Sequence, residues 1–254
     1  MKHVQYLNKI TGQVNFGILE NDYVIKKEVK TNLFSDYTLT DEKVTLEDIK
    51  LLPPVNPENI IAIGLNYRDH AMELNKPIPT KPVVFIKAKS SLLEPEGLIE
   101  LPEISNKVDY EAELAIVIKK TCKGVKAKDA ADYIAGFTMA NDVTARDHQD
   151  LNGQWCLCKS CDTFCPLGPV VESELDASNL GIQAKLNGNI VQKSNTANLI
   201  FKFDYLIEYL SSFMTLQAND IILTGTPSGI GKLSAGDVIE IEIEGIGCLK
   251  NTVK

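Results

Sequence analysis

The chain has 254 residues and a formal net charge of −8, and its composition of 44% hydrophobic and 24% charged residues is that of an ordinary globular protein. No basic stripe stands out, so the attraction for phosphate on which nucleic-acid binding depends is missing. The N-terminus lacks the apolar core of a secretory signal, and no apolar run is long enough to span a membrane. We therefore expect a cytoplasmic protein that binds neither nucleic acid nor membrane.

The first part of the chain alternates short apolar segments with turn signals such as Thr11-Gly12 and Asn21-Asp22. A polar stretch follows, and then three prolines fall within five residues, from Pro53 to Pro57, which excludes helix and disfavours strand. We expect a small N-terminal β domain of residues 1–53 and a main domain of residues 54–254. The short strands expected in the first domain are residues 4–7, 14–19 and 23–29.

The main domain begins with an apolar run at residues 59–64, which leads into a segment without β-branched residues at 65–75. That segment is predicted to be a short helix with Asn66 as a possible cap, and the proline-rich residues 76–82 end it as a possible hinge or lid base. A second helix is predicted at 203–213, with Leu206, Ile207, Leu210 and Phe213 on one face. The other elements expected are strands at 83–87, 221–223 and 238–243, helical turns at 128–133, and an Asn-Gly hairpin at 186–190. Many strands with a few short helices predict an α+β fold on a curled antiparallel or mixed sheet.

Two glutamates stand out in the apolar strand predicted at residues 109–118. Because successive side chains of a strand alternate between its faces, Glu111 and Glu113 share one face. Ala112, Leu114, Ile116 and Ile118 share the other. A third carboxylate, Asp142, follows a second apolar run at 134–139. We predict that the three carboxylates hold a divalent cation, and all-oxygen ligands suit Mg²⁺, Mn²⁺ or Ca²⁺ better than zinc. The alternative is a solvated Glu-x-Glu pair that serves only solubility.

Two further pairs could take part in chemistry. His70 and Glu73 lie three residues apart on the helix predicted at 65–75, where a carboxylate would make the imidazole a better general base for a water. Arg146 and Gln149 have the same spacing, and a guanidinium beside a bound cation is suited to an anionic substrate. On spacing alone, an ordinary surface pair is the favoured interpretation of His70 and Glu73, and the alternative for Arg146 is a surface ion pair with Asp147 or Asp150. The glycine-rich residues 224–229 follow a strand but lack the Gly-Lys-Ser/Thr of a P-loop, so they could line a carboxylate site instead.

Four of the six cysteines crowd into ten residues: Cys156, Cys158, Cys161 and Cys165. Such a cluster suggests zinc or iron–sulfur binding, but the spacing matches neither paired zinc ligands nor a ferredoxin run. Reduced, partly buried thiols are the favoured interpretation.

An ordered set of short motifs resembles the fumarylacetoacetate hydrolase family, in particular the branch of acylpyruvate hydrolases and 2-hydroxyhepta-2,4-diene-1,7-dioate isomerases. The resemblance spans residues 55–254, and each motif is weak alone, whereas the ordered set is specific. The motifs are residues 64–67, 70–73, 109–114, 141–147, 159–164, 166–169 and 224–227.

The resemblance implies a fold of rolled, mostly β, mixed sheets around a metal site, usually in a homodimer. It assigns the metal carboxylates to Glu111, Glu113 and Asp142, and the lid-helix pair to His70 and Glu73. It further assigns the active-site lysine to Lys159 and the substrate contacts to Arg146, Gln149 and Thr226. Cys165 belongs to a family motif, whereas Cys156, Cys158 and Cys161 depart from the family pattern.

The activity implied is that of an Mg²⁺- or Mn²⁺-dependent hydrolase, which cleaves a C–C bond in acylpyruvate-like 2,4-dioxo acids through a metal-bound pyruvate enolate. The alternative is an isomerase, tautomerase or decarboxylase of a 2-oxo or 2-hydroxydienoic diacid, because the same enolate serves those reactions without an attacking water. Two other classes stay open: a non-catalytic binder of metal or dicarboxylate, and a metal sensor built on the cysteines.

Overall fold

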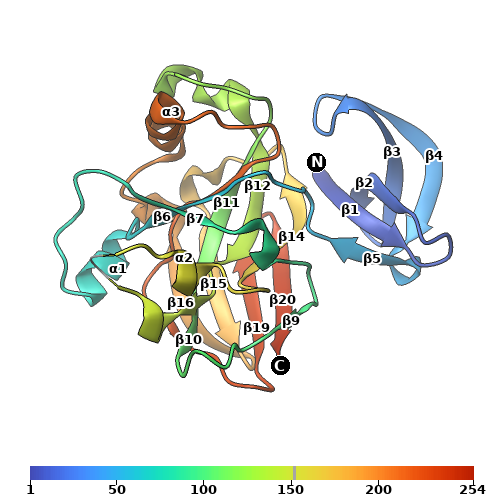
Figure 1. Cartoon of the computed structure of the whole chain (residues 1–254). Coiled ribbons are helices and arrows are strands. Elements are labelled where there is room, and N and C mark those ends of the chain that lie inside the picture. The colour runs from blue at the N-terminus through green and yellow to red at the C-terminus, as the bar shows by residue number, and fades with distance from the viewer. Residues whose placement is uncertain (151–152) are drawn as a thin grey trace.

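The structure is a computed structural model, and it describes residues 1–150 and 153–254. Three β-sheets and a few short helices make up the fold (Figure 1). The N-terminal strands, drawn in blue, form a lobe to one side of the main body (Figure 1). The mostly β, mixed-sheet architecture predicted from the sequence is confirmed.

The largest sheet has twelve strands, in the order β4-β3-β2-β1-β14-β12-β11-β17-β6-β7, with β5 paired to β1 and β8 paired to β14. Its strands in the main body are β6 (Ile60–Gly64), β7 (Val83–Lys87), β8 (Leu92–Leu93), β11 (Ala112–Ile118), β12 (Ile134–Asn141), β14 (Cys165–Glu172) and β17 (Ile221–Leu223). Neighbouring strands are mostly antiparallel, but β17 runs parallel to β6 and β8 runs parallel to β14.

The N-terminal lobe extends the same sheet, because β1 pairs with β14 through Lys2–Glu172 and His3–Val171. Its strands are β1 (Lys2–Asn8), β2 (Val14–Glu20), β3 (Tyr23–Asn32), β4 (Asp36–Thr45) and β5 (Ile49–Leu52). The first three were predicted, but β4 was not, because its residues are largely polar and exposed and carry no apolar alternation. The chain leaves β5 directly before Pro53.

A buried lysine lies where the lobe meets the main body. The Lys27 ammonium is 2.8 Å from Nδ1 of His3, donates a hydrogen bond to the carbonyl of Leu33 at 2.8 Å, and lies 4.4 Å from the centre of the Tyr37 ring. Burial lowers the pKa of Lys27 to about 7. Burial, and then the charge of Lys27, lower the pKa of His3 to about 3, so the imidazole is neutral at physiological pH.

This lysine predicts a pH-dependent stability. Its folded pKa of about 7 lies below its ordinary value of 10.5, so between these values the unfolded chain binds more protons. The Lys27 contribution to the free energy of unfolding therefore rises with pH across that window. We expect this rise to be absent in Lys27→Met. Urea unfolding of both proteins from about pH 6 to about pH 9.5 measures it, as the difference between the wild-type and variant free energies of unfolding at each pH. Parallel pH profiles for the two proteins would contradict the prediction.

Two smaller sheets complete the β structure. The five-stranded sheet has the order β16-β15-β19-β20-β9, and the three-stranded sheet has the order β13-β10-β18. The hairpin predicted at 186–190 is confirmed, since Asn187 and Gly188 form its tip with positive φ angles of 51° and 80°. The strands are β9 (Leu98–Ile99), β10 (Val108–Tyr110), β13 (Thr144–Ala145), β15 (Gly181–Leu186), β16 (Asn189–Asn195), β18 (Gly231–Lys232), β19 (Val238–Ile243) and β20 (Gly247–Val253).

Strand β11 is buried on both faces, so a glutamate on either face is also buried. The predicted face of β11, with Leu114, Ile116 and Ile118, packs into the larger core cluster with residues of α3 (Phe203–Phe213) and β19. The opposite face, with Ala115 and Val117, packs into a second cluster with β6, β14 and β17. Glu113 shares this second face by strand alternation. It lies two residues before Ala115, near the beginning of the strand.

The helices are short, and two predictions about them need correction. Helix α1 is Arg68–Glu73 rather than 65–75, and Asn66 does not cap it, because its buried amide binds the backbone of Phe201 and Thr224. Helix α3 is confirmed at Phe203–Phe213, but Phe213 itself is 54% exposed and contacts the ring of Tyr209 instead of the core.

The remaining helical elements are α2 and several 3₁₀ turns. The helical turns predicted at 128–133 are confirmed as a 3₁₀ helix at Ala127–Tyr133. The others are α2 (Cys156–Lys159) and 3₁₀ helices at Leu46–Asp48, Lys89–Ser91, Arg146–His148, Ala177–Asn179 and Thr196–Asn198. Within the described residues, no helix has both the length and the apolarity needed to span a membrane.

Candidate active site

The register between β11 and β12 brings the three predicted carboxylates together. Ala112 pairs with Asn141 and Glu113 pairs with Ala140, so residue 142 arrives beside residue 111. The Asp142 N–H donates to the Glu111 carbonyl at 2.9 Å, which continues the ladder beyond β12. The Asn141 side chain accepts from the Glu111 N–H at 2.9 Å, so the strand predicted at 109–118 is interrupted at Glu111. The Glu111 and Asp142 carboxylates lie close enough for one ammonium, that of Lys159, to bind both.

Glu111, Glu113 and Asp142 form a buried acidic triad. Each offers one carboxylate oxygen, these oxygens lie within 4.8 Å of one another, and the residues are 6%, 2% and 1% exposed. Three buried carboxylates so close together require positive charge. The spacing and the all-oxygen donor set fit a divalent cation such as Mg²⁺, Mn²⁺ or Ca²⁺. The triad could therefore hold a metal ion.

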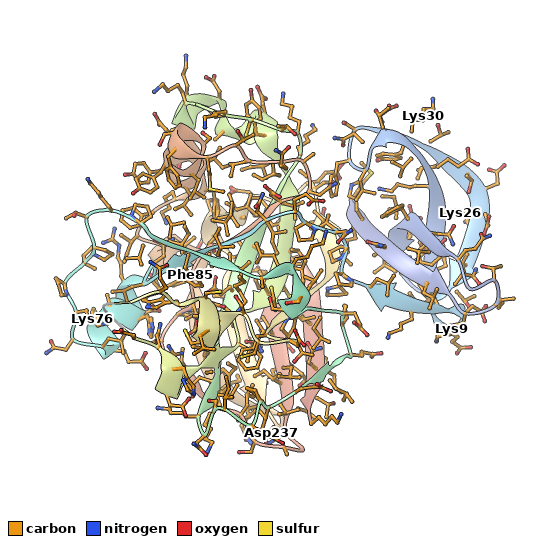
Figure 2. All side chains as sticks on the ribbon, viewed as in Figure 1. Lys9, Lys26, Lys30, Lys76, Phe85 and Asp237 are labelled. Atoms are coloured by element: carbon orange, nitrogen blue, oxygen red, sulfur yellow. The ribbon has the colours of Figure 1, made fainter. Side chains whose placement is uncertain are left out.

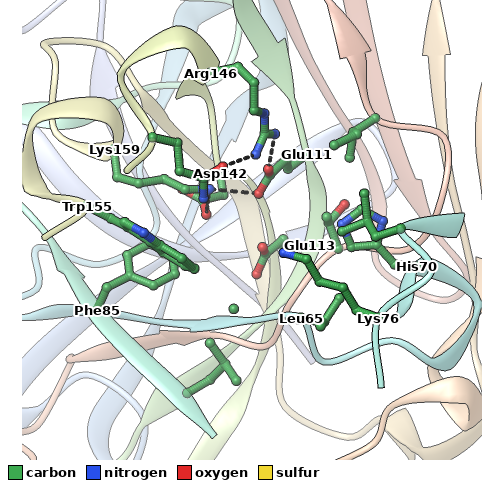
Figure 3. Close-up of a pocket in the computed structure, with 16 residues that line it drawn as sticks. Leu65, His70, Lys76, Phe85, Glu111, Glu113, Asp142, Arg146, Trp155 and Lys159 are labelled. Carbon is green, nitrogen blue, oxygen red and sulfur yellow. Dashed lines mark hydrogen bonds and ion pairs between the residues drawn. The ribbon is translucent and has the colours of Figure 1, made fainter. Parts of the chain in front are cut away.

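Protein cations balance two of the three carboxylates. The Lys159 ammonium bridges Glu111 Oε2 at 2.8 Å and Asp142 Oδ2 at 2.6 Å, and Arg146 binds Glu111 Oε1 (Figure 3). Burial opposes ionisation of Glu111, but the charges of Lys159 and Arg146 outweigh it and lower its pKa to about 2. Burial likewise disfavours the Lys159 ammonium, but Asp142 and Glu111 outweigh it and raise its pKa. Glu111 is thus ionised and Lys159 charged.

Glu113 lacks such compensation. Its Oε2 accepts a hydrogen bond from the Gly225 N–H at 2.6 Å, and no ion pair to it is found among the described residues. Burial raises the pKa of Glu113 well above its usual range, and the charges of Asp142 and Glu111 raise it further. Gly225 has a φ of +101°, and a Cβ there would lie 2.7 Å from the Asn66 Cβ, so only glycine brings this N–H close to Glu113.

The short helix α1 covers one side of the triad and carries the predicted His–Glu pair. His70 Nδ1 is 2.7 Å from Glu73 Oε2, and Glu73 Oε1 accepts from the Gly229 N–H at 2.9 Å. The Asp69 carboxylate accepts hydrogen bonds from the His70 N–H and from the Ser194 hydroxyl. These contacts tie α1 to the 224–229 loop and to β16. Because Glu73 is an acceptor, Nδ1 carries the imidazole proton and Nε2 is left as a base.

These groups line one cavity of about 310 Å³, shown in close-up in Figure 3. Eight of the nine predicted site residues line it, and the ninth, Glu73, lies behind His70. Thr226, on the 224–229 loop, is held by a hydrogen bond from Gln192 Nε2 at 2.9 Å. The predicted Arg146–Gln149 pair is also formed, with 2.7 Å between Nη1 and Oε1. The full lining is Ile63, Gly64, Leu65, His70, Leu74, Lys76, Phe85, Glu111, Glu113, Asp142, Arg146, Gln149, Trp155, Lys159, Thr226 and Ile230.

Several residues of the site were not predicted. Phe85 and Trp155 form an aromatic wall with their ring centres 5.1 Å apart, and the Lys159 ammonium lies 5.1 Å from the Phe85 ring centre. Lys87, which is 1% exposed, donates to Asp142 Oδ1 at 2.6 Å and so gives this carboxylate a second cation. Asp109 accepts from Arg146 Nε at 2.8 Å. The sequence offered one signal for Lys87, a lysine that ends an otherwise apolar strand.

The cysteine cluster does not form a metal site in the part of the chain that is described. The acidic triad is the one group found there that could hold a metal ion, and it contains no cysteine. Cys158 and Cys165 are buried, Cys161 is half-buried and Cys156 is exposed, and all four are free thiols. Their burial agrees with the expectation that these thiols are partly buried.

The comparison with known families agrees with this geometry. The model described as "Fumarylacetoacetate (FAA) hydrolase C-terminal" matches residues 59–254. The chain belongs to the fumarylacetoacetate hydrolase family. The resemblance drawn from the ordered motifs is therefore confirmed, and members of this family are enzymes. A second model, described as "Rv2993c-like, N-terminal", matches residues 1–54.

Relatives within the fumarylacetoacetate hydrolase family carry different activities in their names. "Oxaloacetate tautomerase fahd2, mitochondrial" of Xenopus laevis is 48% identical over 219 residues, which are 81% of this chain and 69% of the relative. The structure of 5-carboxymethyl-2-hydroxymuconate delta-isomerase from Mycobacterium smegmatis has a TM-score of 0.92 and 39% identity, and the match covers 100% of this chain and 99% of the other. Maleylpyruvate hydrolase from Sphingobium has a TM-score of 0.80 and 28% identity, with coverage of 100% and 99%.

Proposed function

We propose that this protein is a divalent-metal-dependent tautomerase or isomerase of 2-oxo or 2-hydroxydienoic dicarboxylic acids. The observation that carries the proposal is the buried acidic triad beside two protein cations in one pocket. Such a site stabilises negative charge that develops on a 2-oxo acid when it enolises. The relatives named as an oxaloacetate tautomerase and a muconate isomerase support this choice over the hydrolase first predicted.

Glu111, Glu113 and Asp142 would hold the metal ion, and a bound divalent cation would act as a Lewis acid toward the substrate. The N–H groups of Lys159 and Arg146 would also donate hydrogen bonds to the substrate oxygens. An ammonium has three N–H donors, and two of those of Lys159 bind Glu111 and Asp142, which leaves one for a substrate oxygen. Arg146 likewise uses one N–H each on Asp109, Glu111 and Gln149, out of five.

We assign proton transfer at C3 of the substrate to His70. Its Nδ1 is engaged by Glu73, so Nε2 is the atom that accepts the proton and returns it. Glu73 orients the ring and stabilises the imidazolium that forms, and the Gly229 N–H holds Glu73 in turn. The aromatic wall of Phe85 and Trp155 and the side chain of Leu65 exclude water from the reacting carbons.

The second candidate is the predicted hydrolysis of a C–C bond in acylpyruvate-like 2,4-dioxo acids. The same His70–Glu73 pair favours it, because a polarised imidazole can activate a water as well as accept a carbon-bound proton. The maleylpyruvate hydrolase among the similar structures supports it at lower identity. A decarboxylase of a 2-oxo diacid would use the same enolate.

One set of ultraviolet assays separates these reactions. We expect purified protein with Mg²⁺ or Mn²⁺ to accelerate the keto–enol interconversion of oxaloacetate, and EDTA to remove the acceleration. Acetylpyruvate, with pyruvate release as the readout, serves as the hydrolase substrate. Metal-dependent pyruvate release without accelerated interconversion would replace the tautomerase proposal with the hydrolase.

The two-domain division at residues 53 and 54, the homodimer and the cytoplasmic location stay predictions. Expression of residues 54–254 alone would test the division, with solubility and retained activity as the readouts. Light scattering of the purified full chain would test the dimer.

A further inference from the structure

One cation of the pocket has no partner among the residues that the structure describes, and no role in the chemistry described above. Three basic side chains line the cavity beside His70: Lys76, Arg146 and Lys159. Arg146 and Lys159 are each bound to two carboxylate side chains. Lys76 is exposed, and no hydrogen bond or ion pair of its ammonium is found among residues 1–150 and 153–254. It is therefore available to a ligand.

Backbone hydrogen bonds at the end of helix α1 fix the position of Lys76. Helix α1 ends in a Schellman motif, in which the Lys76 N–H donates to the Ala71 carbonyl at 2.9 Å and the Asn75 N–H donates to the Met72 carbonyl at 3.0 Å. Asn75 supplies the left-handed residue of this motif, with a φ of 51°. The residue that follows in such a motif is commonly apolar and packs back on the helix. Here it is a lysine, three residues beyond the end of α1 at Glu73.

The side chain extends into the pocket. Lys76 begins on the exposed loop at the edge of the molecule, and Phe85 lies deeper in the same part of the main body (Figure 2). In Figure 3 the Lys76 side chain runs from the loop toward Glu113. The carboxylate triad, Lys159 and Arg146 lie across the cavity from α1. A substrate whose 2-oxo acid end is bound there presents its far end to the loop after α1.

We propose that Lys76 binds the distal carboxylate of the substrate and selects 2-oxo dicarboxylates over 2-oxo acids with a neutral far end. The inference rests on the proposed function, because it takes the 2-oxo acid end to lie at the triad. The other side chains near the far end are apolar, among them Leu65, Leu74 and Ile230. Alone they would favour a methyl group over a carboxylate, so a preference for the carboxylate has to come from the ammonium.

The test compares two substrates that differ only at the far end. Oxaloacetate carries a carboxylate where 2-oxobutanoate carries a methyl group, and loss of the C3 proton signals in D₂O reports enolisation of both. We expect Lys76→Met to raise KM for oxaloacetate about fivefold, the range of a partly exposed ion pair, and to leave 2-oxobutanoate unchanged. The wild-type preference for oxaloacetate should weaken with added salt, and that of the variant should not.

Lys81→Met is the matched control, because Lys81 is an exposed lysine on the same loop that does not line the cavity. If Lys76→Met changes neither substrate, or both equally, Lys76 is not the selective residue although the proposed function stands. If the wild type enolises neither substrate, the proposed function fails, and calorimetry of oxaloacetate binding to the Mg²⁺-loaded protein decides about Lys76. Weaker binding to Lys76→Met than to Lys81→Met then supports the assignment, and equal or absent binding overturns it.

Discussion

Glu113→Gln should abolish binding of Mg²⁺ or Mn²⁺ and lower turnover about 10³-fold, the scale of a lost Lewis acid, while the metal-free protein stays folded. The reason is that Glu113 is buried without a cationic partner among the described residues, so the amide removes an uncompensated charge without breaking an ion pair. Thermal unfolding with and without metal measures this. At a metal concentration of about 100 Kd the wild type should gain about 2.7 kcal/mol, or about 5–10 °C in Tm, and the variant should gain nothing.

Glu111→Gln provides the contrast. It removes the same charge from the triad, but it also takes a partner from both Lys159 and Arg146. Lys159 keeps Asp142 and Arg146 keeps Asp109, so the cost stays below the about 3–5 kcal/mol of a buried charge left unpaired, but this variant should still be less stable even without metal. Glu103→Gln, an exposed glutamate, is the control for the substitution itself. A metal-induced rise in Tm that survives in Glu113→Gln would show that the ion binds elsewhere.

The two glutamates show which features of the site can be predicted from the sequence and which cannot. Strand alternation predicts that Glu111 and Glu113 share a face, and the ordered motifs assign Asp142 to the same site. Neither indicates that Asn141 interrupts the strand at Glu111, or that the β11–β12 register sets residue 142 beside residue 111. Register depends on pairing between segments about 30 residues apart, which local propensity does not encode. The sequence therefore predicts the members of the triad, and the structure explains their unequal charge environments.

Some of the residues that the sequence did not predict act through a second residue. Lys87 supports Asp142 from a strand with no polar periodicity, and Gln192 holds Thr226 from a hairpin strand. Lys87 is the one polar residue of its strand and Gln192 is one of several in β16, and only tertiary contact gives either a role. The same holds for β4, whose polar residues form a strand because β3 offers a paired edge. Asn66 has the residue type of a helix cap, but tertiary hydrogen bonds to Phe201 and Thr224 determine its place.

His70→Gln should lower the rate of enolisation about 10²–10⁴-fold, the range of a positioned general base, and leave metal binding intact. Glutamine keeps a polar group near Glu73, but its amide is too weak a base to accept the C3 proton. The triad does not touch His70 through any hydrogen bond found in the described residues, so the metal-induced rise in Tm should be that of the wild type. Stopped-flow ultraviolet assays of oxaloacetate, with Mg²⁺ present, measure the rate.

Two companion variants decide what the imidazole does. Met72→Gln places the same side chain on the same helix at a position that is 75% exposed, and it should leave the rate unchanged. Glu73→Gln keeps the imidazole but removes the charge that stabilises its protonated form, so we expect a smaller loss, roughly 10- to 100-fold. If His70→Gln retains enolisation and loses only release of pyruvate from acetylpyruvate, the pair activates water, and the chain is a hydrolase built on the same enolate site.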